Sequence, residues 1–332
     1  MFESLDKEQE TLIEKAKKNL KKLSQSQREV LLKKIQKPDI FKHTHDVKES
    51  ELEKIKIGII SDTQINSIFC LEELIKKLYN WFVAEKVDFV VHAGDFTDGD
   101  YSKIRPDHRF QTYVQGFNNV VKYVAEVYPK TNLYTLFIMG NHDYTYFREN
   151  KADICEAIST IRKDLIYLGT VKDFPEKLKS IVEPTKWQDL HHFFTYWEAN
   201  LLIGKQKKCK LTIAHPVRGG YTLTYGVQKK SEIYEDFKKP HILITGDEHK
   251  QGLLFIRGMH IIQGGTTQYQ SLFMRSKDLM ANIGGAIISL KIRYDGTIDS
   301  LNYKESPKEW NSEALEKAIE KQKKYISKLA EI

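Results

Sequence analysis

The sequence predicts an α/β fold in which two facing β-sheets are flanked by helices, and three observations lead to this prediction. Between about residues 55 and 140, short apolar runs typical of buried strands alternate with segments of helical periodicity. Further apolar runs with strand character fill the second half, where turns that contain glycine join them. Polar residues stand directly after several runs, where open α/β folds bind their ligands.

The first half predicts a β-α-β-α-β unit. Strands are expected over residues 55–61, 88–94 and 133–140, each bounded by turn residues. Helical spacing of apolar residues predicts a helix between the first two strands and a second helix between Tyr113 and Val124. This order implies a parallel sheet with right-handed crossovers.

The second half contains more strands than helices. Strand character is found in KLTIAHP, HILITGD, GLLFIRG, MHIIQGG and GAIISLKIRY. The last four are expected to form a mostly antiparallel set.

The main domain is expected to span residues 55–300, with a segment added at each end. Residues 1–50 are predicted to form a helical extension in which Ser26 and Glu29 fit a capping box and Pro38 ends the second helix. A brace that packs on the main domain is favoured over a nucleic-acid arm or a docking element. Residues 307–332 are predicted to form a C-terminal amphipathic helix after Pro307.

The composition is that of a folded soluble protein, with 41% hydrophobic and 29% charged residues, and it excludes disordered and fibrous classes. A net charge of +7 is compatible with an anionic partner such as nucleic acid, although lysines interleaved with glutamates are more typical of solvated helix faces. Three scattered cysteines, the lack of a secretory signal and the lack of a membrane-spanning apolar run predict a cytoplasmic location and no membrane association.

Carboxylate, amide and imidazole side chains follow five of the expected strands. They occur in DTQ (62–64), GDFTD (94–98), GNHD (140–143), AHP (214–216) and GDEH (246–249). Such side chains suit hard or borderline divalent cations, and thiolates are absent from the set. Two cations about 3.5–4 Å apart can clamp a phosphoryl group for in-line attack.

The order of these motifs resembles the calcineurin-like metallophosphoesterases, whose usual pattern is DxH, GDxxD, GNHD or GNHE, a lone histidine, and GHxH. The resemblance covers about residues 55–295, and GDFTDG, GNHDY, RKDLIYLG and GGTTQYQSLFMR are similar to stretches in predicted phage and prokaryotic members. It implies a four-layer sandwich and a metal-dependent phosphoesterase in which a bridging hydroxide attacks phosphorus in line.

The resemblance also implies roles for individual residues. One metal would be held by Asp62, Gln64, Asp95 and His249, and the other by Asp95, Asn141, His215 and Asp247. His142 would act on the transition state or the leaving oxygen and would be oriented by Asp143. Asp98 is expected to hold the motif loop together rather than to bind metal.

Two ligands differ from the usual pattern, because Gln64 and Asp247 stand where relatives carry histidine. Both side chains can coordinate a metal, and the anionic oxygen of Asp247 favours manganese or magnesium over zinc or iron at the second site. Manganese is expected, with magnesium, iron, zinc or nickel as alternatives. The alternatives are a hydrogen-bonding or solvent-facing role for Gln64, and a turn or a pair with Lys250 for Asp247.

Several polar residues outside the motifs are further candidates for the site. Arg218 is a candidate for gripping a substrate phosphate or for a plain surface loop, and Arg275 has a similar status. His43 and His45 are expected in a linker, His92 in the core and His260 within a strand.

Together these observations favour a phosphodiesterase or nuclease that acts on a phosphoester substrate, with nucleic acid slightly preferred. The alternative is a catalytically weak or inactive module that keeps the fold and binds nucleic acid or protein. Metal content and hydrolysis of simple phosphodiesters separate the two hypotheses.

Overall fold

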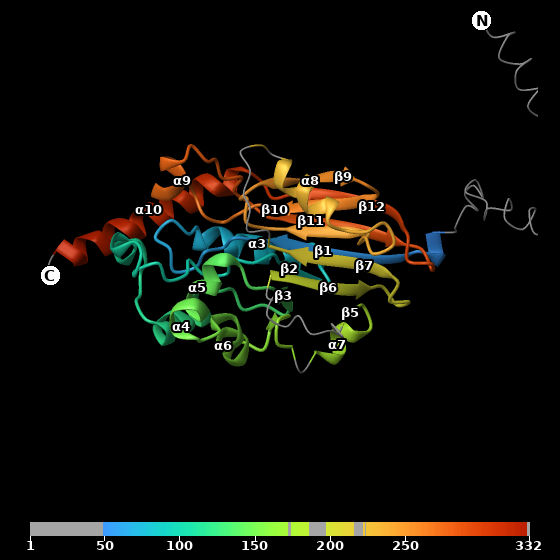
Figure 1. Cartoon of the computed structure of the whole chain (residues 1–332), viewed down its shortest axis with the longest axis horizontal. Helices are drawn as coiled ribbons and strands as arrows, with labels where there is room; N and C mark the ends of the chain where they lie inside the picture. Colours follow the sequence, from blue (N-terminus) through green and yellow to red (C-terminus); the bar gives the residue numbers. More distant parts are fainter. Residues whose placement is uncertain (1–48, 172–173, 186–196, 216–221, 223, 331–332) are drawn as a thin grey trace, which may run out of the picture. The chain divides into compact units, whose positions relative to one another are not determined.

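The computed structural model describes residues 49–171, 174–185, 197–215, 222 and 224–330, and the fold below concerns these residues (Figure 1). Except for Glu49, they belong to a compact unit that runs from Ser50 to Ile332. The predicted helical extension over residues 1–50 lies almost wholly outside the described part, and so do His43, His45 and Arg218. In the described ranges, no helix is long and apolar enough to cross a membrane.

The first sheet is mixed and has six strands in the order β12-β11-β1-β2-β3-β4. Its parallel part, β1 to β4, comes from the first half of the chain, and β11 pairs antiparallel with β1. Strand β1 is buried along most of its length, as a strand covered on both faces must be. The strands are β1 (Glu53–Ile60), β2 (Phe89–His92), β3 (Thr135–Phe137), β4 (Leu165–Tyr167), β11 (Ala286–Ile292) and β12 (Ile298–Glu305).

The second sheet also has six strands, in the order β5-β6-β7-β8-β10-β9. Strands β7, β8 and β10 run parallel, and the outer pairs are antiparallel. The strands are β5 (Val182–Pro184), β6 (Glu198–Ile203), β7 (Cys209–Ala214), β8 (Ile242–Thr245), β9 (Gln251–Ile256) and β10 (Met259–Gly264).

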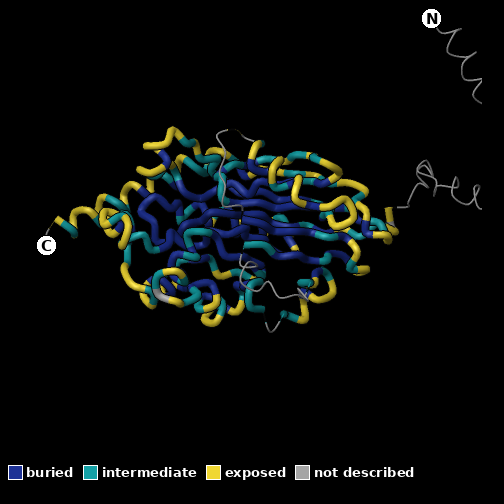
Figure 2. Tube along the Cα trace, in the orientation of Figure 1, coloured by how far each residue is buried: buried dark blue, intermediate teal, exposed yellow. Residues whose placement is uncertain are grey.

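Three apolar clusters hold four layers together. The middle cluster joins the two sheets through aliphatic side chains such as Ile57 on β1 and Ile213 on β7. A second cluster packs the first sheet under helices, through residues such as Leu78 and Val124, and the third places Val227 of α8 on the second sheet. Figure 2 shows this buried interior, with exposed residues on the outer helices and loops. The predicted α/β sandwich is therefore confirmed.

Helices cover both outer faces of the sandwich. Helix α10 lies beside α3, where the rings of Trp81 and Trp310 meet edge to face at 6.0 Å and Lys321 pairs with Glu72. The α-helices are α3 (Glu72–Ala84), α4 (Phe117–Val127), α5 (Asn141–Asn150), α6 (Ile154–Ile161), α7 (Glu176–Lys179), α8 (Tyr225–Glu232), α9 (Leu272–Ser276) and α10 (Glu309–Ala330). Short 3-10 helices are η1 (Glu49–Glu51) and η2 (Pro106–Gln111).

Two expectations about elements were wrong. The last four strands of the second half are not a mostly antiparallel set, because β10 runs parallel to β8 and β11 joins the first sheet beside β1. An apolar run shows that a strand is buried but does not show which sheet it enters. The second helix begins at Phe117 rather than near Tyr113, because Gly116 has a φ of 85° and Tyr113 bonds with the backbone of Asn66.

Candidate metal centre

The predicted ligands lie at the carboxyl ends of strands from both sheets. Asp62 follows β1, Asp95 follows β2, and Asn141 begins α5 after β3. From the second sheet, His215 follows β7, and Asp247 and His249 follow β8. Because β1, β2 and β3 are mutually parallel, as are β7 and β8, each sheet delivers its ligands to one edge.

Five of these residues have backbone angles that side chains rarely adopt. The φ angles are 49° at Asp62, 43° at Gln64, 53° at Asp95, 79° at Asp247 and 51° at His249. A left-handed conformation at a residue other than glycine costs about 1 kcal/mol or more and persists only where the surroundings enforce it. The predicted ligands therefore adopt a strained backbone conformation of the kind that is common at binding sites.

Two motif glycines allow the strand ends to approach one another closely. A β-carbon on Gly140 would lie 2.1 Å from Oδ1 of Asp95, and one on Gly94 would lie 2.5 Å from Nδ1 of His215. Gly94 also has a φ of 94°. The glycines of GDFTD and GNHD are therefore steric requirements of the site.

The first group of ligands comprises Asp62, Gln64 and His249. Nε2 of Gln64 donates to Nε2 of His249 over 3.2 Å, and the same imidazole nitrogen lies 3.5 Å from Oδ1 of Asp62. Ser61 and the backbone N–H of Asp247 donate to the carboxylate of Asp62 and fix its orientation. The three side chains therefore converge at Nε2 of His249.

The second group surrounds one nitrogen of His215. Its Nδ1 donates to the carbonyl of Ala93 over 2.8 Å, which turns Nε2 toward the site. Three oxygens crowd this Nε2, from Asn141 at 2.8 Å, Asp95 at 3.3 Å and Asp247 at 3.7 Å. Such a cluster needs a proton or a cation at its centre, and an imidazole whose other nitrogen is held by a carbonyl is the usual metal ligand.

The two groups meet at Asp95. Ligand atoms of Asp62, Asp95 and His215 all lie within 4.8 Å of one another, and all three residues are buried. Asp95 therefore stands between the groups, where a bridging ligand is expected.

Charges within the site are poorly compensated by the protein alone. Burial raises the pKa of Asp62 well above its usual value and that of Asp247 to about 7. Burial also acts to raise the pKa of Asp95, but His215 and His142 outweigh it and lower this pKa. For His215, burial is outweighed by Asp95, and the pKa is raised. Burial thus disfavours the ionised form of Asp62 and Asp247, whereas histidines favour that of Asp95, and a bound cation would favour the ionised form of all three.

Two buried polar atoms support the same conclusion. Oδ2 of Asp247 and Nδ1 of His249 have no hydrogen-bond partner among the described residues. Buried polar atoms are nearly always paired, and unpaired ones are typical of sites that bind an ion or ligand. The residues present therefore fit a divalent metal centre.

His142 lies beside the centre, and Asp98 positions it. Nδ1 of His142 donates to the carbonyl of Asp98 over 2.9 Å, and Nε2 lies 3.8 Å from Oδ2 of Asp95. Burial acts to lower the pKa of His142, but Asp95 and Asp98 outweigh it and raise the pKa. The imidazole is therefore biased toward carrying a proton on the nitrogen that faces the site.

Asp143 has a different part from the expected one. Its carboxylate accepts hydrogen bonds from the backbone N–H groups of Gly140, Phe96 and Thr97 and from the Thr97 hydroxyl, at 2.7–3.0 Å. It thereby fastens the loop after β2 to the start of α5. Asp98 has its expected part in the loop, since its N–H donates to Ile65 and its carboxylate pairs with His108, and its carbonyl also binds His142, where the Asp143 carboxylate was expected.

The remaining candidates lie away from the ligands or outside the described chain. Arg218 lies outside the described residues, and Arg275 is exposed on α9. His92 is fully buried and shares a hydrogen bond of 2.9 Å with Thr63, as expected of a core histidine. His260 lies on β10, as expected.

Sequence reasoning missed two residues that support the centre. Thr266 donates to the carbonyl of Asp62 over 2.7 Å, and the ring of Tyr101 contacts that of His142 edge to face at 5.1 Å. Thr266 lies in the GGTTQYQ stretch, and the similarity of this stretch to relatives could have pointed to it. No motif in the sequence pointed to Tyr101.

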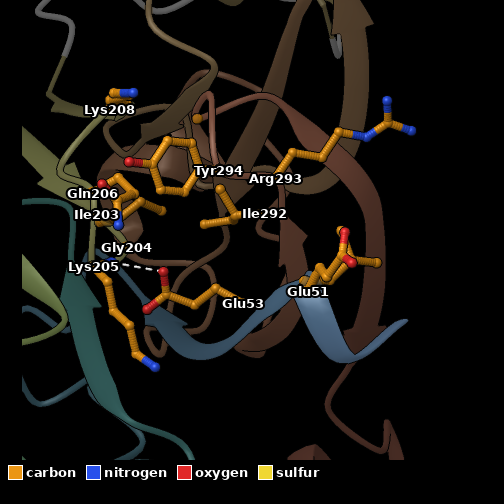
Figure 3. A pocket seen from close by; sticks show the side chains of 12 residues that line it. Glu51, Glu53, Ile203, Gly204, Lys205, Gln206, Lys208, Ile292, Arg293 and Tyr294 are labelled. Carbon is orange, nitrogen blue, oxygen red and sulfur yellow. Dashed lines mark hydrogen bonds between the residues drawn. The ribbon is translucent and has the colours of Figure 1, made fainter. Parts of the chain in front are cut away.

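A pocket of about 200 Å³ lies at the opposite end of β1 (Figure 3). Glu53, the first residue of β1, lines it and accepts a hydrogen bond of 2.6 Å from the backbone of Lys205. Because β1 has eight residues, about 25 Å separates this pocket from Asp62. The pocket is therefore distinct from the candidate metal centre.

The part of the chain that carries the candidate ligands is similar to known proteins. The sequence model described as calcineurin-like phosphoesterase matches residues 55–251. The chain is 23% identical over 271 residues to the DNA polymerase II small subunit of Methanothermobacter thermautotrophicus. The match covers 72% of this chain and 52% of that protein. The chain thus spans about half the length of this curated relative.

The solved structures that match this chain have lower sequence identity to it. A structure described as a novel archaeal phosphodiesterase is 16% identical with a TM-score of 0.37, and the match covers 76% of this chain and all of that one. A putative 5′-nucleotidase from Staphylococcus aureus is 12% identical with a TM-score of 0.37, over 81% of this chain and 58% of that one.

Proposed function

Because this chain belongs to the calcineurin-like phosphoesterase family, we propose that it is a metal-dependent phosphodiesterase or nuclease with two divalent ions at the joined strand ends. The observation that carries the proposal is the convergence of Asp62, Asp95 and His215 within 4.8 Å, beside the inward nitrogen of His142. A divalent pair held there would supply a hydroxide nucleophile near neutral pH and would neutralise charge on the phosphoryl oxygens.

The two groups of ligands suggest how the ions are shared. We assign one ion to Asp62, Gln64 and His249, the other to Asn141, His215 and Asp247, and Asp95 to both. Gln64 and Asp247 contribute oxygen in place of the more usual imidazole nitrogen, which favours manganese, with magnesium, iron, zinc and nickel as alternatives.

His142 has the position of an acid or a charge stabiliser. Its Nδ1 is fixed by Asp98, so Nε2 is the nitrogen that can donate to a phosphoryl oxygen or a leaving oxygen. Asp143 acts indirectly by fixing the loop that carries Asp95 and Asp98.

Nucleic acid is the proposed substrate among phosphodiesters. The net charge of +7 favours a polyanion, and the similarity to a subunit of a DNA polymerase supports the same choice. Three buried cysteines without a disulfide are in keeping with a cytoplasmic location, which we propose as well.

Hydrolysis of model esters tests this proposal. The metal-stripped chain supplied with Mn²⁺ is expected to hydrolyse bis-p-nitrophenyl phosphate faster than p-nitrophenyl phosphate, and Asp95→Asn is expected to abolish both activities. Two bound ions without turnover of any diester would instead favour the alternative, a binding module that keeps the fold.

A further inference from the structure

Beside the metal centre, an arginine is held between two aromatic rings. The guanidinium of Arg105 lies 4.6 Å from the ring centroid of Tyr101 and 5.5 Å from that of Phe273. Tyr101 in turn contacts the ring of His142 at 5.1 Å. An unbroken series of contacts therefore leads from His142 to the outer surface.

Both segments that carry these residues are fastened to the centre. The loop after β2 is joined to α5, since Asp98 binds His142 and the N–H of Asp100 donates to Thr145 over 2.6 Å. The segment before α9 is joined to Asp62 through Thr266. Figure 1 shows α9 and α5 toward the same end of the unit, away from the start of β1. The position of Arg105 and Phe273 relative to the ligands is therefore fixed by the fold.

This surface combines exposed apolar side chains with positive charge. Ile104 is 64% exposed, Leu272 58% and Phe273 52%, although apolar side chains of this size are usually buried. Residues 103–109 and 272–278 carry five lysine or arginine side chains and two aspartates. Among the described residues, the guanidinium of Arg105 contacts the two rings and forms no salt bridge with a carboxylate. It remains able to receive a phosphate.

We propose that this surface, formed by Ile104, Arg105, Leu272 and Phe273, binds single-stranded nucleic acid next to the scissile phosphate. A base stacks on the exposed face of Phe273 and its neighbouring phosphate pairs with Arg105. This inference rests on the proposed function, because it names the substrate class of the same site.

The chemistry of the surface selects a single strand over other phosphoesters. Flat aromatic side chains next to a cation are how proteins hold unpaired bases, whereas bases stacked in a duplex do not expose their faces. Phosphopeptides are usually gripped by clusters of arginines, and that mode of binding gives no part to an exposed aromatic ring such as Phe273. Single-stranded DNA or RNA is therefore the occupant that fits.

Binding of a labelled oligothymidylate, measured by fluorescence anisotropy in EDTA, tests the proposal. Phe273→Ala and Arg105→Ala are each expected to weaken binding about tenfold, the usual effect of losing one base stack or one charged contact. Phe273→Tyr should retain the affinity because the flat ring is kept. Phe255→Ala is the matched control, since Phe255 is 67% exposed on β9 at the edge of the other sheet.

Two outcomes would overturn the proposal. One is unchanged affinity of both alanine variants, which would show that the strand binds elsewhere. The other is tighter binding of a duplex or a phosphopeptide than of the single strand, with the same loss in Arg105→Ala. Since EDTA prevents hydrolysis, the binding result is independent of whether bis-p-nitrophenyl phosphate is turned over, and failure of one proposal can be told from failure of the other.

Discussion

The amide nitrogen of Gln64 lies 3.2 Å from Nε2 of His249, within the group of residues proposed to hold the first ion. In the usual DxH motif of the family, a histidine stands at the position of Gln64. The side chain is nearly fully buried and its backbone is left-handed, with a φ of 43°. A solvent-facing role for Gln64 is therefore excluded by its position.

Replacing Gln64 should change metal affinity. Gln64→Ala is expected to weaken Mn²⁺ binding about tenfold because one oxygen donor is lost, whereas Gln64→His should bind at least as tightly as the natural chain. Isothermal titration of the metal-stripped protein measures both. Gln228→Ala, on the exposed face of α8, is the control, and equal affinity of all variants would show that Gln64 is not a ligand.

Removing the imidazole of His142 should impair turnover more than metal binding. His142→Ala is expected to lower kcat about 10²–10⁴-fold, the usual contribution of a general acid, while the bound metal content stays the same. His260→Ala on β10 provides a histidine control outside the site. A parallel loss of metal in His142→Ala would assign His142 to the ligand set instead.

Asp143 should matter chiefly for stability. Asp143→Ala leaves three buried N–H groups without their acceptor, so the free energy of unfolding is expected to fall by about 3 kcal/mol. Asp299→Ala, which removes a surface pair with Arg293, should cost less than about 1 kcal/mol. Urea unfolding compares them. A similar, small effect of both substitutions would contradict the role of Asp143 in holding the loop.

Asp247 should give the metal-free protein a distinctive pH dependence. Burial raises its folded pKa from 3.8 to about 7, so the folded chain binds a proton that the unfolded chain releases between these values. The contribution of Asp247 to stability is therefore fully present below about pH 4 and lost as pH rises through 7, a change on the order of 4 kcal/mol.

The pH dependence is measured as the difference between the natural chain and Asp247→Asn in EDTA. This difference should fall between pH 4 and 7, and saturating Mn²⁺ should abolish the fall because it binds the ionised carboxylate. Asp236→Asn is a control in which the stability difference should change with pH in the opposite direction. Hydrogen bonding to Lys239 lowers the pKa of that exposed carboxylate. A difference that is flat or rises with pH would contradict the burial of Asp247.

The sequence predicted the strand ends well because their signal is local. A buried apolar run that is followed by a polar side chain indicates a parallel strand that ends at the ligand-binding edge. The structure brings together the four residues predicted in this way, Asp62, Asp95, Asn141 and His215. The sheet to which β11 belongs was not predictable, because its apolar pattern suits either sheet. That the Asp98 carbonyl, and not the Asp143 carboxylate, binds His142 depends on the turn of one loop, which the order of residues does not reveal.

The contact between Tyr101 and His142 and the enclosure of Arg105 were also beyond sequence reasoning. Tyr101 and Arg105 belong to none of the motifs, and their partners His142 and Phe273 lie far from them in the chain. Both contacts depend on how the loop after β2 folds beside α5 and α9.

The count of Mn²⁺ ions bound per chain, with Asp95→Asn measured beside the natural protein, tests the central claim most directly. If the strand ends form a dinuclear centre, the natural chain should bind two ions and lose at least one in Asp95→Asn, because Asp95 stands between the two groups of ligands. A natural chain that binds no Mn²⁺, Mg²⁺, Fe²⁺, Zn²⁺ or Ni²⁺ at any concentration would contradict the account.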